Sequence, residues 1–295
     1  MNIAFRISCG LLCLSVLPLP TTLCQDTQPA IEPDIVYGHK DGLAMTMDHF
    51  QPTAESNHAA VIFMVSGGWY SRWSPPETMK PLFQPYLDAG FTVLAVRHGS
   101  SPRYTIPEAV SDVNRAVRFI RLSADRFEID PDRLGVLGMS AGGHLSLVLG
   151  TTGDDGDAGN NDAVDATASR VQAVVALVPP TDLRVAVWES PESLPAYRGF
   201  PALDLPMKEA EEHSPLVHVS SDDAPSLVIM GGRDELVPKR HGEWIAEAFA
   251  KENVPHKLIV FPDAGHGLEG DDNRTTLVKE ATAWFQQHLV DRPAK

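Results

Sequence analysis

The stretch Leu134-Gly135-Val136-Leu137-Gly138-Met139-Ser140-Ala141-Gly142-Gly143-His144 decides the fold of this chain. Its first half is short and apolar, which predicts a buried strand. Residues 138–142 fit the Gly-x-Ser-x-Gly pattern, in which a serine sits on a strained turn and its hydroxyl projects above a sheet. The apolar run up to Leu149 predicts a helix whose free N–H groups point at Ser140. The alternative interpretation is an ordinary glycine-rich turn.

Two residues later in the chain are candidates to activate Ser140. A serine hydroxyl is a weak nucleophile, which needs a base and a third group that orients the base. Asp234 follows the apolar segment 226–230, and His266 follows the apolar segment 257–261. Ligands bind at the edge of a parallel sheet where the strands end, so we expect both residues near Ser140. The chain order of serine, acid and histidine is one that such triads adopt.

Other residues compete for these roles. Glu235 and Asp263 are neighbouring carboxylates, and Asp234 is favoured over both because it begins the pattern Asp-x-Leu-Val-Pro. Asp234 could otherwise cap the helix that follows it. His144 lies on the helix that leaves the serine turn, where a packing or hydrogen-bonding role is expected. His98 follows a predicted strand and is a candidate for lining the pocket.

Backbone donors are needed to stabilise the negatively charged oxygen of a tetrahedral intermediate. The N–H of Ala141, directly after the serine, is the first expected donor. The second is expected in Ser66-Gly67-Gly68-Trp69-Tyr70, which follows a buried apolar strand. We predict that Gly67 and Gly68 supply it, because glycine permits inward-pointing N–H groups. Trp69 is the alternative, and a structural Gly-Gly turn is the non-functional interpretation.

Apolar segments alternate with helical patterns along the whole chain. This alternation predicts one α/β domain, with a mostly parallel twisted sheet and helices on both faces. The irregular segment 183–219 is predicted to be a short insertion that arches over Ser140. Trp188 in this insertion, together with Trp69 and Tyr70, is predicted to contact the substrate and to crowd its acyl group.

The segment 151–170 is rich in Gly, Asp and Asn, which predicts a surface loop. Its acidic run resembles a calcium loop at first sight. The order of its residues does not match an EF-hand, so a solvated acidic loop is favoured over a metal site.

Composition restricts the class of protein. The chain has 295 residues, of which 43% are hydrophobic, enough for a packed core. Its formal net charge of −15 argues against nucleic acid or an anionic membrane as a partner. No apolar run after the N-terminal segment is long enough to predict a transmembrane helix.

The N-terminal segment predicts export. Arg6 is the only charged residue in 1–24, and an apolar stretch fills residues 7–19, which together predict a signal peptide. Cleavage is expected after Thr22 or Cys24, and a retained anchor or a lipid on Cys24 are the alternatives. All three cysteines lie in this segment, so the mature chain has none. The expected organisation is a signal peptide at 1–24, a linker at 25–32 and an α/β-hydrolase domain at 33–295, in a secreted or periplasmic protein.

The motifs together resemble a known family over residues 35–289. The chain looks like an α/β-hydrolase of the group that includes bacterial feruloyl and acetyl-xylan esterases and kynurenine formamidase, and it is also similar to the catalytic domain of prolyl oligopeptidases. The resemblance rests on residues 66–69, 129–133, 138–144, 180–183, 234–238 and 265–267. It implies a catalytic triad of Ser140, Asp234 and His266. One position departs from the family, which usually has histidine where this chain has Ser66, and that histidine normally braces the oxyanion loop.

These observations predict a secreted serine hydrolase that acts on carboxylic esters through an acyl-enzyme on Ser140. Short-chain acyl esters, or acyl groups on small molecules and carbohydrates, are the expected substrates, and no metal or organic cofactor is expected. A serine peptidase of the prolyl oligopeptidase type is the first alternative. A non-catalytic binding protein on a hydrolase scaffold is the second. The oligomeric state and the identities of the acyl and alcohol groups do not follow from the sequence.

Overall fold

Eight strands form a single sheet in the computed structural model, which describes Met1 and residues 30–291. The strands are β1 (Ile31–Lys40), β2 (Leu43–Phe50), β3 (Ala60–Met64), β4 (Thr92–Val96), β5 (Leu134–Met139), β6 (Ala173–Leu177), β7 (Ser226–Gly231) and β8 (His256–Phe261). Their order across the sheet is β1-β2-β4-β3-β5-β6-β7-β8. β2 is antiparallel to β1 and β4, and all other neighbours are parallel. The predicted α/β architecture is therefore confirmed, whereas the predicted signal peptide at 1–24 lies in the part that the structure does not describe, Met1 apart.

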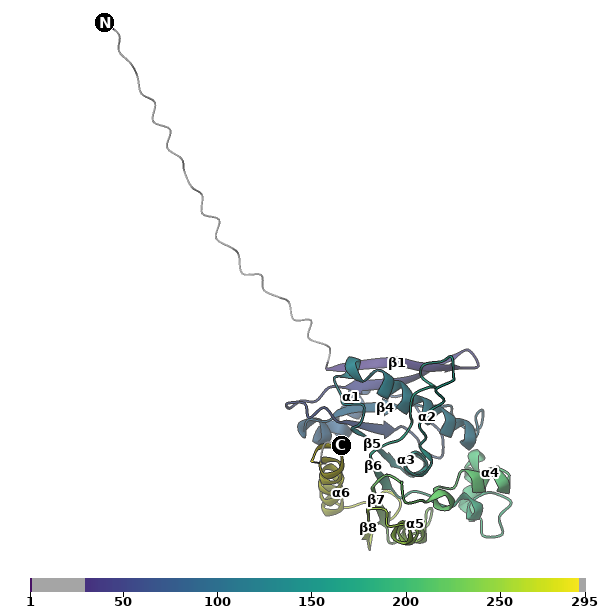
Figure 1. Cartoon of the computed structure of the whole chain (residues 1–295). Coiled ribbons are helices and arrows are strands. Elements are labelled where there is room, and N and C mark those ends of the chain that lie inside the picture. Colours follow the sequence, from purple (N-terminus) through teal and green to yellow (C-terminus); the bar gives the residue numbers. More distant parts are fainter. Residues whose placement is uncertain (2–29, 292–295) are drawn as a thin grey trace.

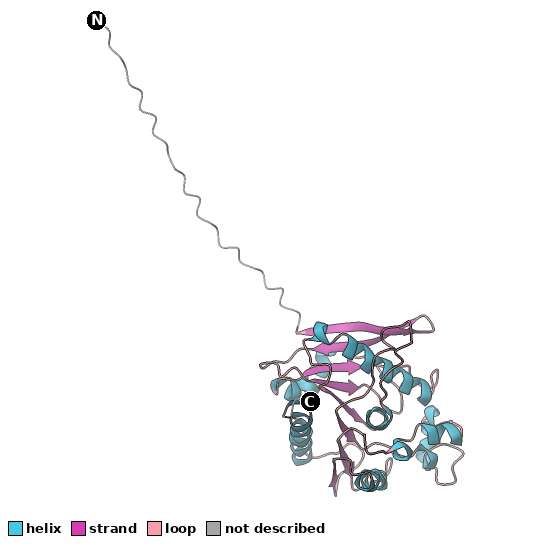
Figure 2. Ribbon diagram, in the orientation of Figure 1, coloured by secondary structure: helices cyan, strands magenta, loops and turns pink. Residues whose placement is uncertain are grey.

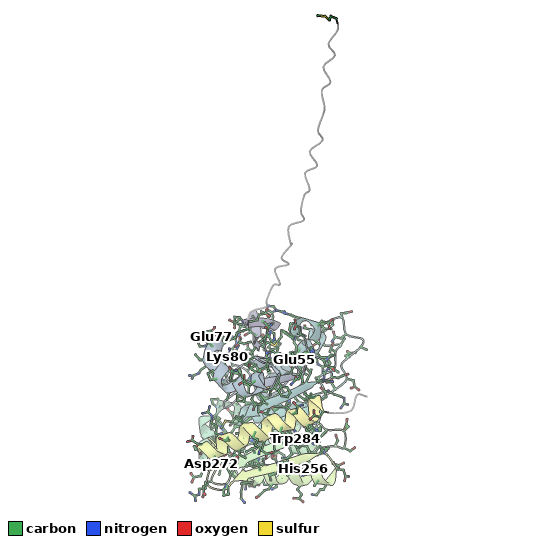
Figure 3. The ribbon with its side chains drawn as sticks, turned by 90° about the vertical axis from the view of Figure 1, so that its left-hand side faces the viewer. Glu55, Glu77, Lys80, His256, Asp272 and Trp284 are labelled. Atoms are coloured by element: carbon green, nitrogen blue, oxygen red, sulfur yellow. The ribbon has the colours of Figure 1, made fainter. Side chains whose placement is uncertain are left out.

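Helices cover both faces of this sheet, as Figure 2 shows. They are α1 (Pro76–Asp88), α2 (Ile106–Leu122), α3 (Ala141–Thr152), α4 (Met207–Glu212), α5 (Arg240–Lys251) and α6 (Asp271–Phe285), which a π-helical turn continues (Gln286–Val290). α1 and α6 lie on one side of the sheet, and α2, α3 and α5 lie on the other (Figure 1). Figure 3 views the first side, with Glu77 and Lys80 on α1 and Trp284 on α6.

Each helix buries its apolar stripe against one face of the sheet. On α2, residues such as Val113 and Val117 are fully buried, and a capping box between Thr105 and Glu108 satisfies the free N–H groups of its first turn. On α6, Phe285 is fully buried in the opposite cluster, so Phe285→Ala is expected to cost about 3–5 kcal/mol of folding free energy. The two apolar layers hold the strand ends, and thus the loops after them, in fixed positions.

The insertion consists of short helical turns in addition to α4. They are Leu183–Val185, Pro195–Gly199, Pro201–Leu203 and Pro215–His218. Its residues Leu183, Tyr197 and Leu203 are buried in the same cluster as α3. The insertion is therefore packed onto the domain beside the helix that begins at the serine turn.

The acidic loop at 153–170 is held by arginines. Arg118 pairs with Asp154 at 2.7 Å, and Arg170 pairs with Asp155 at 2.8 Å. Across residues 30–291, no group of His, Cys, Asp or Glu could hold a metal ion. The prediction of a surface loop is confirmed.

Within residues 30–291, no helix has the length and apolarity that crossing a membrane requires.

Candidate active site

Ser140 occupies a strained turn between β5 and α3. Its φ of 55° and ψ of −120° are rare for a residue with a side chain, and its N–H donates to the carbonyl of Leu177 at 2.8 Å. The turn is possible only because glycine precedes and follows it. A Cβ on Gly138 would lie 2.2 Å from the carbonyl oxygen of Gly142, and a Cβ on Gly142 would lie 2.7 Å from that of Met64. The glycines thus let the strand and helix approach closely enough to project the hydroxyl.

The structure brings Ser140, His266 and Asp234 together. The Oγ of Ser140 lies 2.9 Å from Nε2 of His266, and Nδ1 of His266 lies 2.8 Å from Oδ2 of Asp234. Both distances fall in the range of good hydrogen bonds. The carboxylate accepts from Nδ1–H, so Nε2 is left without a proton and can take one from the serine hydroxyl. This is the geometry that a nucleophile, its base and an orienting acid require.

Asp234 is fixed more firmly than either competing carboxylate. Its side chain is fully buried, and its second oxygen accepts from the N–H groups of Leu236 at 2.9 Å and Val237 at 2.8 Å. Glu235 is exposed, and Asp263 is 81% exposed and pairs with an arginine. The loop after β7 therefore holds one carboxylate rigidly in place and aims it at His266.

The loop after β3 forms a tight turn beside Ser140. Gly67 and Tyr70 exchange two backbone hydrogen bonds of 3.0 Å, and the two residues between them have positive φ, 58° for Gly68 and 57° for Trp69. This is the pattern of a type I′ turn. The N–H of Gly67 already donates to Tyr70, so the prediction that Gly67 is an oxyanion donor is wrong. The remaining candidates are Gly68, Trp69 and, across from them, Ala141.

Buried side chains support this turn from two directions. The hydroxyl of Ser66 donates to Nε2 of His98 at 2.8 Å, while Nδ1 of His98 donates to the carbonyl of Gly99 at 2.8 Å. His98 is 4% exposed, and burial lowers its pKa, which keeps the ring neutral and able to accept. An imidazole from the end of β4 thus lies against the loop at Ser66, the position where the family resemblance predicted a histidine. His98, a candidate for lining the pocket, does not line it, and its contacts assign it to the support of the loop.

Trp69 is held by the second buried histidine. Its indole N–H donates to Nδ1 of His144 at 3.3 Å, and Nε2 of His144 donates to the carbonyl of His213 at 2.8 Å. Burial lowers the pKa of His144 to about 4. These bonds fix a residue whose left-handed backbone costs about 1–2 kcal/mol. The structural role predicted for His144 is confirmed.

A small apolar pocket opens at Ser140. Its volume is about 30 Å³, and its walls include Trp69, Tyr197, Phe200 and Leu203. Phe200 lies directly over the oxyanion loop, since a Cβ on Gly68 would be 2.6 Å from its ring. Burial raises the pKa of Tyr197 to about 12, and its hydroxyl donates to the carbonyl of Leu236 at 2.7 Å, so this wall is neutral and rigid.

Of the three residues predicted to contact the substrate, only Trp69 lines the pocket at Ser140. Trp69 lines the pocket, whereas Trp188 is not among the residues that line it and donates its indole N–H to the carbonyl of Tyr197 at 2.9 Å. Tyr70 is 51% exposed and lies on the outer side of the turn. The sequence analysis did not identify Phe200, because its position depends on how the insertion folds back over the loop.

Comparison with known proteins agrees with this geometry. A model of the family described as BD-FAE matches residues 47–249. The chain is 29% identical over 248 residues to the probable carboxylic ester hydrolase LipM of Mycobacterium tuberculosis. The alignment covers 80% of this chain and 57% of LipM. The chain therefore spans a little over half the length of that relative. A second relative, dipeptidyl aminopeptidase BIII of Pseudoxanthomonas mexicana, is 30% identical over 55% of this chain and 22% of its own length.

Solved structures share the fold. The acetyl ester-xyloside bifunctional hydrolase of Caldicellulosiruptor lactoaceticus superposes with a TM-score of 0.74 at 24% identity, covering 86% of this chain and 95% of its own. At that identity the likeness establishes the fold alone. The insertion, the type I′ turn and the Ser66–His98 pair must therefore be interpreted from this chain's own contacts.

Proposed function

Because the chain belongs to the BD-FAE family, we propose that it is a serine hydrolase of carboxylic esters, with a preference for short acyl groups. The observation that carries the proposal is the pair of hydrogen bonds that joins Ser140 to His266 and His266 to Asp234, at 2.9 Å and 2.8 Å, at the mouth of an apolar pocket. Small-molecule or carbohydrate esters are the proposed substrates. The name of LipM, a probable carboxylic ester hydrolase, supports ester hydrolysis, and the acetyl ester-xyloside bifunctional hydrolase shares the fold.

Acylation begins at Ser140. Its Oγ attacks the ester carbonyl carbon while Nε2 of His266 takes the hydroxyl proton, and the buried carboxylate of Asp234 stabilises the imidazolium that forms. The carbonyl oxygen becomes negatively charged and accepts hydrogen bonds from the N–H of Ala141 and from Gly68 or Trp69. His266 then gives its proton to the alcohol oxygen, which leaves.

Deacylation repeats these steps with water. His266 takes a proton from a water molecule, whose oxygen attacks the acyl carbon, and the proton returns to Ser140 as the acid is released. No residue outside the site is required for the proton transfers. The mechanism predicts that the acyl-enzyme is identical for esters that share an acyl group.

Labelling with a fluorophosphonate tests the proposal. The wild type should be labelled at one site, identified by mass spectrometry as Ser140, and should release acetate from p-nitrophenyl acetate. Ser140→Ala should abolish labelling and lower kcat by about 10³-fold or more while the protein stays folded. Labelling without ester turnover would instead support a peptidase, and the absence of labelling would support a non-catalytic binding protein.

A peptidase is the second candidate, favoured by the likeness to dipeptidyl aminopeptidase BIII. That relative matches over 22% of its length, so most of its chain has no counterpart in the alignment. Comparing kcat/KM for p-nitrophenyl acetate and for a proline-containing peptide anilide distinguishes the two activities.

We also propose that the protein is exported. Mass spectrometry of the N-terminus of the mature protein tests this proposal.

A further inference from the structure

A second cavity lies on the other side of the oxyanion turn. Its volume is about 370 Å³, and its lining includes Ser66, Gly67, Tyr70, Arg72, Met79 and Met139. The acyl pocket is lined instead by the inner residues of the same turn, Gly68 and Trp69, and by Ser140. The two cavities thus share the oxyanion turn, and Met139, which lines the second cavity, directly precedes Ser140, which lines the first.

The position of His266 indicates which half of the ester enters the second cavity. His266 must protonate the departing alcohol oxygen, so the alcohol leaves on the side from which the imidazole approaches. The residues that flank its loop, Ala264 and Leu268, are buried in the apolar cluster against which Met79 and Met139 pack. Met79 lies on α1, the helix that carries the labelled Glu77 and Lys80 in Figure 3. The second cavity and the loop of the general acid thus share one face of the sheet.

An unpaired cation lines this cavity. Among the arginines within residues 30–291, only Arg72 and Arg274 have side chains without a hydrogen bond or an ion pair, and Arg274 lies on α6. Arg72 is exposed and lines this cavity together with Tyr70, which is 51% exposed. In a chain with a formal net charge of −15, a free guanidinium in a cavity that shares the oxyanion turn with the acyl pocket is a local attraction for an anion.

We propose that this cavity is the subsite for the alcohol half of the substrate, and that Arg72 selects alcohols that carry a carboxylate. This inference rests on the proposed esterase function and adds the chemical class of the leaving group. A uronic-acid sugar fits both features, because its carboxylate can pair with the guanidinium and its ring can pack on the exposed face of Tyr70. The acyl group, by contrast, meets only the apolar walls of the small pocket.

A pair of esters tests the proposal. Acetate release is measured from an acetylated methyl glucuronoside and from the methyl glucoside acetylated at the same hydroxyl, and the readout is the ratio of their kcat/KM values. Arg72→Gln should lower the ratio of acidic to neutral substrate by about 1.5-fold to fivefold, the range expected for an exposed charge pair. Arg103→Gln, which removes an exposed arginine elsewhere, should leave the ratio as in the wild type.

Salt provides a measurement that does not depend on a variant. The ratio in the wild type should fall as the ionic strength rises from about 0.01 M to 1 M, because salt screens an exposed pair. A ratio that neither Arg72→Gln nor salt changes would overturn the proposal. If the wild type hydrolyses neither acetate ester nor p-nitrophenyl acetate, the proposed esterase function itself fails. If it hydrolyses both sugar esters with a salt-independent ratio, only the role of Arg72 fails.

Discussion

Enlarging the acyl pocket at Phe200 should change which esters the enzyme prefers. The free volume of the pocket is only about 30 Å³, between walls that include Trp69 and Phe200, so we expect it to favour an acetyl ester over esters with longer acyl groups. Phe200 is the most suitable wall residue to truncate, because Trp69 also belongs to the oxyanion turn and bonds His144. A Trp69→Ala variant would therefore alter the donors and the pocket together.

The magnitude follows from two opposing free energies. In the wild type, forcing the two extra methylenes of a butyryl group into a filled pocket costs on the order of 1–3 kcal/mol. In Phe200→Ala the same methylenes are buried favourably, at about 0.8 kcal/mol each, or about 1.6 kcal/mol together. The variant should thus prefer butyryl to acetyl by about 15-fold, whereas the wild type should prefer acetyl by about fivefold or more.

The assay compares kcat/KM for p-nitrophenyl acetate, butyrate and hexanoate. These substrates share a leaving group, so their ratios report the acyl pocket alone. Phe119→Ala is the matched control, because Phe119 is a partly buried phenylalanine on α2 that does not line the pocket. If Phe200→Ala keeps the wild-type ratio of butyrate to acetate, Phe200 does not form the acyl wall and the reasoning from volume is wrong.

Further outcomes concern the turn, the triad and the core. Ser66→Ala leaves Nε2 of buried His98 without its hydrogen-bond donor, which costs about 1–3 kcal/mol of folding free energy. The variant should have a kcat lower by about fivefold or more, with little change in KM. A wild-type kcat would mean that the turn does not need this hydrogen bond. Gly68→Ala should lose most of its activity and also unfold at a lower midpoint, because its Cβ would lie 2.6 Å from a ring carbon of Phe200 at a φ of 58°. Steady-state kinetics at a temperature where the variant is folded checks this, and wild-type kcat in the folded variant would contradict it. Asp234→Asn should lower kcat by about 10³–10⁴-fold, and a loss below tenfold would exclude it as the orienting group. Burial lowers the pKa of His49 from 6.5 to about 4. Between these two pH values the unfolded chain binds more protons than the folded protein, so the free energy of unfolding falls as the pH drops. In urea unfolding across this window, His49→Leu should lose less of that free energy than the wild type, and an identical pH dependence in the two proteins would contradict the argument.

Much of the site was predictable because parallel strands end at one edge. Asp234 and His266 each follow an apolar segment directly, and the pairing of β5, β6, β7 and β8 brings the loops after these strands together. The helix and strand predictions held for the same reason, since their apolar periodicity matches the two faces that are buried. The alternation of apolar strand segments with helical patterns therefore predicted both the fold and the position of the triad.

The details of the oxyanion turn were not predictable from residue types. Gly67 and Gly68 look equivalent in sequence, and only the hydrogen bonds between Gly67 and Tyr70 decide which N–H is free. The support from His98 was missed because it comes from a different strand, 32 residues away from its partner Ser66. Phe200 was missed because irregular, proline-containing segments have no periodicity from which their path could be inferred.

The separation of the reacting residues along the chain has a consequence for biosynthesis. Ser140 and the imidazole that activates it are 126 residues apart, and His266 follows β8, the last strand of the sheet in chain order. A ribosome makes the chain from its N-terminus, so the serine emerges seconds before the histidine at about 5–20 residues per second. During this interval the hydroxyl has no base within reach. The nascent polypeptide is therefore unable to hydrolyse esters until its final strand has docked, and the appearance of activity reports completion of the whole domain.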